Sequence, residues 1–524
     1  MREMYSAWPW ISGRKRAVHC GERWLAILEC GGLEAVPKPR VLSATRGFNW
    51  IEHSLLRCMM VNAIRADYSQ GYVLPPFVED WVPGGHPARY IRDFVDHLDL
   101  QAMGFEEPEA YEGRPRYAAD LLLKVLLYGF FSKIRSFRTL EKACCENLGM
   151  LYLTGANYPD HNTLWRFWKA NRDRFKEVFR DLVFVARRSK IVGLSLHAVD
   201  GTKIQAQVAG HSAWHVEELK RELGEIERQV EAWMAEVEAR STDEPGFMLP
   251  AELQDAKARR EAIEASLKEL AEIGREHLHP LDKEARMMKM AGRIELGYNA
   301  QVVADGESGL IVAEEVVHSE NDLRMLVPMI EETVVNLGSA AQMTVADTGY
   351  CSAEQLAEAE GRDHSVLVSM PKAGRKPFHK AQFEYDAERD VVMCPKGEPL
   401  TYERDRRWRD RPAVRIYRCH SGATCGNRLE CSRDRRGRCI EIGPYDGAVS
   451  RQRKAQKEGE NRALLKRRGA IVELVFAQIK ENMGFRRFTV RGEAKVRAQW
   501  SLICTGFNLR KLFRYWAAGT LVLG

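Results

Sequence analysis

Two short apolar segments, each followed closely by an aspartate and a glycine, constrain the fold of this chain most strongly. The first covers residues 191–199 and leads into Asp200, and the second covers residues 343–346 and leads into Asp347. Apolar runs of this length predict buried strands, so each should carry an aspartate to the end or edge of a strand. The alternative is that each aspartate and glycine belong to an ordinary turn.

The segments around these two runs predict a mixed α/β sheet. Three strands, a helix, the strand before Asp347, a second helix and a last strand follow one another. This is the order of a ribonuclease-H-like fold, whose central strands place carboxylates at neighbouring ends. The further expected elements are strands at 298–304 and 310–317 joined by a hairpin turn at 305–309, a helix at 322–337, a helix opened by Ser352 and a strand at 366–368.

A third acidic residue, Glu473, lies in the basic stretch from Lys466 to Lys480. The apolar residues around it recur at helical spacing, which predicts a helix packed on a core with Glu473 near its inner edge. An acid in that position needs a cationic partner, either an arginine or a metal ion. Lys480 follows Glu473 by seven residues and shares its face. The apolar neighbours are Ile471, Val472, Val475, Phe476 and Ile479.

The composition changes along the chain and suggests five parts. The apolar residues before Met59 do not recur at a sustained helical or strand spacing. We therefore expect the biological start at Met59 or Met60. The expected parts are a non-native N-terminal extension (1–58), a helical domain (59–185), the first part of the α/β core (191–373) with a helical insertion (214–290), a basic Cys-bearing insertion (374–446), and the C-terminal helical part of the core with Glu473 (447–516).

Three of these parts allow more than one interpretation. Three expected helices, with exposed basic residues on the last, fit either a helix-turn-helix reader of DNA or simple three-helix packing. The insertion at 214–290 has the spacing of a helical hairpin or short antiparallel coiled coil. In the Cys-bearing insertion, thiolates hold zinc or are reduced structural cysteines. The four zinc candidates are Cys394, Cys419, Cys425 and Cys431.

Charge is distributed unevenly. The net charge is only +6, yet residues 451–516 contain 17 Lys and Arg against 5 Asp and Glu. Such a segment either binds a polyanion or forms a solvated basic helix. No apolar run is long enough to span a membrane, and no signal peptide is indicated. The scattered cysteines fit a reducing compartment, so we expect a cytoplasmic protein. No P-loop, serine-hydrolase or zincin signature is present.

Asp200, Asp347 and Glu473 together suggest a metal site. Three carboxylates at one point repel one another unless divalent cations neutralise them, and oxygen ligands suit Mg²⁺. Two such ions can activate an attacking oxygen and stabilise a leaving one at phosphorus. Nearby cations would hold a nucleic-acid backbone. These DNA-binding candidates are Arg467, Arg468, Lys480, Arg486 and Arg487.

The sequence resembles the DDE transposases of bacterial insertion sequences, in the branch with an InsH-like N-terminal domain. The resemblance covers about residues 60–514. Related transposases carry a tyrosine and an arginine upstream of the glutamate and a lysine after it. Glu473 and Lys480 keep that spacing, whereas Lys466 and Gly469 stand at the tyrosine and arginine positions. The motifs that carry the resemblance lie at residues 136–141, 159–163, 199–203, 346–350 and 471–488.

The resemblance implies Asp200, Asp347 and Glu473 as catalytic ligands of Mg²⁺ or Mn²⁺ in a ribonuclease-H-like domain. It implies cleavage of DNA at terminal inverted repeats and strand transfer into target DNA by a homodimer or larger assembly at the bacterial nucleoid. Two other classes stay open. One is a decayed or domesticated DNA-binding regulator, and the other is a nuclease or resolvase that cuts without joining.

Overall fold

The structure is a computed structural model of the 524-residue chain. The residues expected to form a non-native extension, 1–58, lie outside the part that it describes, as do residues 59–76 of the expected helical domain. The described residues all fall within one of the two units of the chain, Leu74–Gly524. They are 77–106, 116–208, 213–239, 251–272, 274–279, 281–290, 292–371, 378–386, 388–407, 412–421 and 424–523.

Helices precede the first strand. Helix α4 is buried almost all round, as its apolar sequence predicts. Helix α7 begins at His161 because the Asp160 carboxylate accepts a hydrogen bond from the Thr163 amide at 2.8 Å. The short helix α6 was not expected from the sequence. The helices are η3 (Val78–Trp81), α3 (Pro87–Asp96), α4 (Ala119–Phe131), α5 (Phe137–Glu146), α6 (Leu148–Thr154), α7 (His161–Ala170), η4 (Arg172–Arg174) and α8 (Phe175–Arg188).

A six-stranded mixed sheet follows, which makes the fold mixed α/β. Strands β5, β1, β7 and β8 lie side by side in that order, and β4 and β6 both pair with the long strand β5. Strand β1 is antiparallel to β5 and parallel to β7, which is parallel to β8. The strands are β1 (Leu196–Gln205), β4 (Arg286–Met290), β5 (Arg293–Asp305), β6 (Ile311–Val317), β7 (Met343–Ala346) and β8 (Val366–Val368).

Three helical elements accompany this sheet between its strands. Helix α11 starts four residues later than expected, and Ser352 is the N-cap of α12 as predicted. Their bounds are α11 (Leu326–Leu337), η6 (Thr348–Tyr350) and α12 (Ala353–Gly361).

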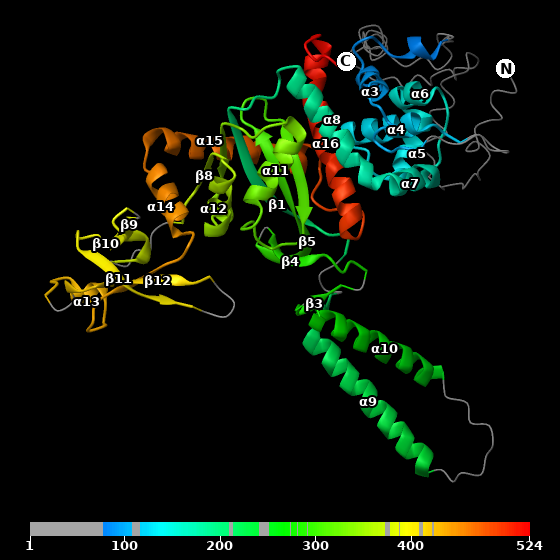
Figure 1. The fold of residues 1–524 in the computed structure, drawn as a ribbon. Coiled ribbons are helices and arrows are strands. Elements are labelled where there is room, and N and C mark those ends of the chain that lie inside the picture. The colour runs from blue at the N-terminus through cyan, green and yellow to red at the C-terminus, as the bar shows by residue number, and fades with distance from the viewer. Residues whose placement is uncertain are drawn as a thin grey trace, which may run out of the picture. The chain divides into compact units, whose positions relative to one another are not determined.

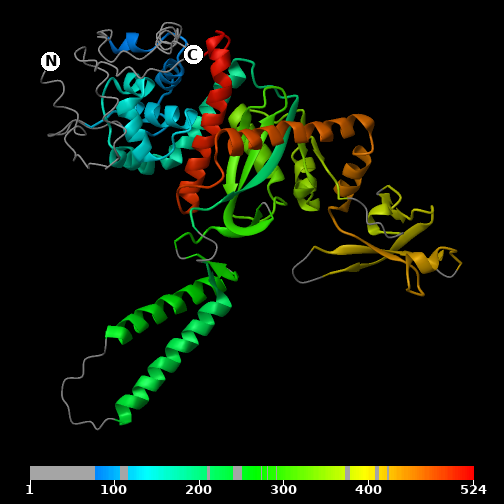
Figure 2. The same cartoon turned by 180° about the vertical axis from the view of Figure 1, so that it is seen from behind.

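A helical hairpin separates β1 from β4. Its helices α9 (Val216–Ala239) and α10 (Ala251–Glu272) lie side by side in both views (Figures 1 and 2). The buried residues Leu219, Ile226, Ile263 and Leu270 form a small core of their own. A two-stranded ribbon, β2 (Trp214–His215) and β3 (His277–Leu278), closes its base. The expected insertion at 214–290 extends too far, because β4 belongs to the main sheet.

The Cys-bearing segment forms a separate antiparallel sheet of five strands, in the order β13-β12-β11-β10-β9. It has its own buried core, which includes Val392, Leu400 and Tyr417. Its elements are η7 (Lys380–Gln382), β9 (Glu384–Asp386), β10 (Val391–Met393), β11 (Pro399–Arg406), β12 (Val414–Cys419), α13 (Arg428–Cys431) and β13 (Cys439–Ile442).

The chain ends in helices that return to the main sheet. Helix α15 (Gly459–Ala477) continues into the π-helix η9 (Gln478–Asn482), after α14 (Asp446–Ala455). Helix α16 (Glu493–Ala517) packs against β6, α4 and α8. The main core therefore includes residues from Val82 to Leu521. Among the described residues, no helix is both long and apolar enough to cross a membrane.

Candidate functional site

Asp200 within β1 and Asp347 directly after β7 lie at the same level of two neighbouring parallel strands. Ala198 of β1 is paired with Val345 of β7, so the same register carries Asp200 opposite Asp347. Asp200 sits inside β1, which continues to Gln205, rather than at a strand end as the sequence suggested. Asp347 follows the last residue of β7 and caps η6, accepting a hydrogen bond from the Gly349 amide at 2.8 Å.

The surroundings of Asp200 oppose its ionisation. Burial raises the pKa of this carboxyl to about 6; the Arg468 guanidinium lowers it, and the charge of Asp347 raises it. Each carboxylate oxygen has a donor. Oδ1 accepts from the Gly201 amide at 2.8 Å, and Oδ2 accepts from Arg468 Nη1 at 3.0 Å. A side-chain cation therefore already occupies one oxygen of Asp200.

Lys480 reaches the same strand from the π-helix η9. Its Nζ donates to Thr202 Oγ1 at 2.5 Å and to the Lys203 carbonyl at 3.5 Å. Burial lowers the pKa of Lys480, and the nearby positive charge of Arg486 lowers it further. Lys480 therefore lies beside the strand that carries Asp200.

Glu473 does not lie where the sequence analysis placed it. Its side chain is exposed rather than at the inner edge of α15, and it forms no ion pair with any described residue. Gly469 lies one helical turn before Glu473. Glu473 Oε1 is 3.2 Å from the position that a Cβ atom on Gly469 would take. No group of three or more metal-binding side chains occurs among the described residues. The structure thus brings Asp200 and Asp347 together but does not add Glu473 to them.

A carboxylate that the sequence analysis overlooked, Asp322, borders the aspartate pair. A Cβ atom placed on Gly201 would lie 2.8 Å from Asp322 Oδ1. A Cβ atom placed on Gly349 would lie 3.4 Å from Asp322 Oδ2. Gly201 follows Asp200, and Gly349 lies two residues after Asp347. Asp322 was taken for the first residue of a helix, but α11 begins only at Leu326.

Three donors on the sheet hold Asp322 Oδ1. They are Asn299 Nδ2 at 2.6 Å, Gln301 Nε2 at 2.7 Å and Lys203 Nζ at 3.4 Å. Burial lowers the pKa of Lys203, and the charges of Asp322, Asp200 and Asp347 counteract that effect. The sequence signal that could have identified Asp322 is the alternation of Asn299 and Gln301 within an otherwise apolar strand, because buried amides need polar partners.

The other predicted DNA-binding residues have neighbours outside the aspartate pair. Arg467 donates to the Gly306 carbonyl at 2.9 Å. Arg487 donates to Gln205 Oε1 at 3.0 Å, at the far end of β1. Arg486 forms an exposed ion pair with Glu481. All three are exposed, so their charges are available to a ligand at modest cost.

The predicted zinc ligands gather in the five-stranded sheet. Cys419 belongs to its core, and Cys394 and Cys431 pack against that core. Burial raises the pKa of the Cys431 thiol, Arg438 opposes this change, and the nearby Cys394, Cys419 and Cys425 add to it. The cysteines are free thiols. As for the carboxylates, the described residues contain no assembled group of three metal ligands here.

Two family models match the chain. One, described as a transposase DDE domain, matches residues 393–513, and the other, described as a transposase domain (DUF772), matches residues 76–170. The first match contains Glu473 and Lys480, and neither match contains Asp200 or Asp347. No curated protein matches the chain. The matched segments lie before and after the strands that carry the two aspartates.

Proposed function

We propose that this chain, which belongs to the insertion-sequence DDE transposases, cuts DNA at the ends of its element and joins those ends to target DNA. The single observation that best supports this activity is the pairing of Ala198 with Val345, which precede Asp200 and Asp347 by two residues each. The strand order of the main sheet also supports a ribonuclease-H-like catalytic domain. Residues 59–185, which include the matched residues 76–170, would be the helical DNA-binding domain.

Asp200 and Asp347 would hold Mg²⁺ or Mn²⁺, with Glu473 as the third ligand. The donors fit such an ion because they are carboxylates, which hard divalent cations prefer, and because the burial of Asp200 is unfavourable for an uncompensated charge. When bound, the ion supplies Lewis acidity at the scissile phosphate. Arg468 would have to release Asp200 Oδ2 as the ion enters.

The chain's own cations would position the DNA. Lys480 is fixed by Thr202 beside the aspartate strand, so it would hold the scissile phosphate close to Asp200. The exposed residues Arg467, Arg486 and Arg487 would contact the flanking backbone. Two copies of the chain, each bound to one end, would form the synaptic complex.

The experiment is a nicking and strand-transfer assay on DNA from the inverted repeats that flank the gene. Asp200→Asn, Asp347→Asn and Glu473→Gln should each abolish Mg²⁺-dependent nicking while end binding survives, because only the ligands of the ion are lost. Glu481→Gln is a matched control. Glu481 is an exposed acid in η9, the continuation of the helix that carries Glu473, and it pairs with Arg486. Full nicking by any one of the three variants would remove that residue from the site.

A second candidate function is a DNA-binding regulator that recognises ends without cutting them. It is favoured by Gly469 at the family's arginine position and by the exposed Glu473 outside the aspartate pair. In that case the wild-type chain binds end DNA in gel-shift experiments but produces no nick in Mg²⁺ or Mn²⁺.

Zinc at Cys394, Cys419, Cys425 and Cys431 is a further part of the proposal. The turn after Cys394 supports it, since the Lys396 amide donates to Cys394 Sγ at 3.2 Å and Gly397 adopts φ +87°. Zinc would supply a structural crosslink, because four thiolates leave no open position. Elemental analysis of protein purified without chelator should find one zinc per chain, and Cys425→Ser should lower this content. A value far below one contradicts the site.

A further inference from the structure

Two histidines face each other at the base of the helical hairpin. His215 of β2 and His277 of β3 are direct partners across the two-stranded ribbon, and their ring centroids lie 4.4 Å apart. The Val216 amide donates to the Glu276 carbonyl at 3.1 Å, so residues 216 and 276 are the hydrogen-bonded pair. The histidines beside it therefore form a non-hydrogen-bonded pair, the kind in which opposite side chains approach most closely.

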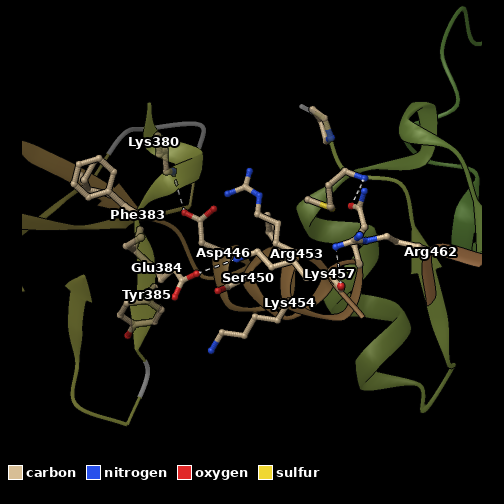
Figure 3. A pocket seen from close by; sticks show the side chains of 16 residues that line it. Lys380, Phe383, Glu384, Tyr385, Asp446, Ser450, Arg453, Lys454, Lys457 and Arg462 are labelled. Carbon is tan, nitrogen blue, oxygen red and sulfur yellow. Dashed lines mark hydrogen bonds and ion pairs between the residues drawn. The ribbon is translucent and has the colours of Figure 1, made fainter. Parts of the chain in front are cut away.

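The ring nitrogens of both histidines are available to a ligand. Neither ring forms a hydrogen bond or an ion pair within the described part of the chain, whereas eight other described histidines each engage a ring nitrogen in a hydrogen bond. Charged groups elsewhere are also matched. In the cavity that η7 and α14 line, Asp446 and Glu384 each pair with a lysine, at 3.2 and 3.3 Å (Figure 3). Both histidines are only half-buried, so solvent reaches them.

The chain around this pair carries a negative charge. Within five residues of one or the other histidine, four exposed acids stand against two cations, Lys220 and Arg275. Opposite charges attract, so this charge favours a cationic ligand over an anionic one. The four acids are Glu217, Glu218, Glu272 and Glu276.

Two neutral imidazoles in this arrangement can share one metal ion. Imidazole nitrogen is a preferred ligand of Zn²⁺, Ni²⁺ and Cu²⁺. Two nitrogens bound to one tetrahedral Zn²⁺ lie roughly 3.3 Å apart, since each Zn–N bond is about 2.0–2.1 Å long. Rings whose centroids are 4.4 Å apart need only a small rotation to meet that spacing. Because no group of three metal-binding side chains occurs among the described residues, water would complete the coordination.

We propose that His215 and His277 bind a divalent transition-metal ion, for which Zn²⁺ is the test ion. The ion would crosslink the strand that enters the hairpin to the strand that leaves it. Each of these strands is only two residues long, and so short a ribbon is at best marginally stable by itself. This site is independent of the proposed function, because neither DNA nor the aspartate pair takes part.

The test follows hydrogen exchange by mass spectrometry in the full-length chain, first stripped of metal and then given Zn²⁺. An ion that binds only the closed ribbon lowers the fraction of open ribbon by a factor of 1 + [Zn²⁺]/Kd. Exchange of peptides from 213–219 and 270–279 should therefore slow by up to about 100-fold at a Zn²⁺ concentration 100 times the Kd. Zinc bound at the cysteines affects other peptides, those from 394–439.

Substitutions test whether the two rings are the ligands. His215→Gln and His277→Gln should each abolish the slowing, because one imidazole alone leaves no crosslink. His277→Cys should restore it, since a thiolate also binds zinc but cannot stack as an imidazole does. His318→Gln is the matched control, because His318 is an exposed histidine that pairs with Glu493 at 3.3 Å. This control should keep the full response to Zn²⁺.

The choice of ion gives a test that needs no variant. Mg²⁺ at the same concentration should leave ribbon exchange in the wild type unchanged, because this hard ion prefers oxygen ligands. Circular dichroism identifies any variant that fails to fold. Unchanged ribbon exchange of the wild type in Zn²⁺, equal slowing by Mg²⁺, or slowing that persists in both Gln variants overturns the site. Faster exchange of the Gln variants without metal, together with no zinc effect on the wild type, would show that the rings only stack.

Discussion

Arg468 and Asp200 form an ion pair at the place where we propose that a divalent ion binds. The buried carboxylate of Asp200 pairs with the Arg468 guanidinium, whose Nη1 lies 3.0 Å from Oδ2. Both side chains are mostly buried, with exposed fractions of 16% and 19%. A buried pair of this kind is costly to break unless another cation takes over. Arg468 should therefore compete with the ion at Asp200 and contact phosphate once displaced.

Arg468→Gln should lower the Mg²⁺ concentration needed for half-maximal nicking, because the competitor at Asp200 Oδ2 is gone. The same change should lower the maximal rate, since the phosphate contact is lost as well. A Mg²⁺ titration of nicking measures both effects. Arg467→Gln is the control, because Arg467 binds the Gly306 carbonyl instead of an aspartate. An unchanged half-maximal Mg²⁺ concentration contradicts the competition.

Asp322 should act as a positioning residue for the aspartate pair. Its carboxylate fixes Lys203, Asn299 and Gln301, which lie beside Asp200 and its neighbours. Asp322→Asn should reduce the nicking rate by about 10–100-fold, as loss of outer-shell partners does at metal sites, with end-DNA affinity unchanged. A rightward shift of the Mg²⁺ titration distinguishes this role from a purely structural one. The exposed neighbour Glu320, changed to Gln, should leave rate and titration unaltered.

At the scale of elements, local pattern predicted some boundaries and missed others. The strands at 343–346 and 366–368 agree with β7 and β8, because fully buried parallel strands appear as continuous apolar runs. Strand β1 was placed too early. The second half of β1 carries polar side chains that contact Asp322 and Lys480. Both partners come from distant parts of the chain. Helix α11 was extended to Asp322 because an aspartate before an apolar helix also has the pattern of an N-cap.

The exposure of Glu473 has a similar cause. The buried residues of α15 are Ile471, Val472, Val475 and Phe476, and they define a face that the helical period predicts well. The same period leaves Glu473 at the border of that face, where a small rotation of the helix decides between burial and exposure. Only the contacts between α15 and the sheet fix that rotation. These contacts join distant parts of the chain, so the local sequence pattern of α15 does not predict them.

The packing of β6 against α16 should make folding stability depend on pH through Glu314. Burial raises the pKa of this carboxyl from 4.5 to about 8; Lys176 opposes the change and Glu315 adds to it. The folded chain then binds more protons than the unfolded chain between these values, so stability falls as pH rises through that window. Ser501 Oγ donates to Glu314 Oε1 at 2.6 Å.

Glu314→Gln should remove this loss, because the amide stays neutral and can still accept from Ser501. At pH 8 the variant should exceed wild type in free energy of unfolding by on the order of 3–5 kcal/mol, and near pH 4.5 the two should agree. Urea unfolding over this pH range gives the measurement. Glu320→Gln should keep the wild-type pH profile. A constant difference between Glu314→Gln and wild type at all pH values would contradict the assignment.

The described part of the chain forms three hydrophobic cores of unequal size. The hairpin and the five-stranded sheet each bury their own small cluster. The N-terminal helices, in contrast, share the main core with the central sheet and α16. The rings of Tyr90, Phe513 and Trp516 pack together, and Arg510 Nη1 donates to the Phe131 carbonyl at 2.9 Å. The sequence suggested a separate helical domain at 59–185, whereas the described helices of that segment bury their apolar residues in the same core as the central sheet.

Two deletions should therefore behave differently. Trp214 and Leu278 are directly paired across β2 and β3, so removing residues 215–277 and joining the ends with two glycines should leave the main core intact. Its thermal unfolding, followed by near-ultraviolet circular dichroism, should keep the wild-type midpoint. Removing residues 1–190 instead should expose the faces of β6 and α16 that α8 and α4 cover and abolish the cooperative transition. A cooperative transition in the second variant would show that the helices form an independent domain.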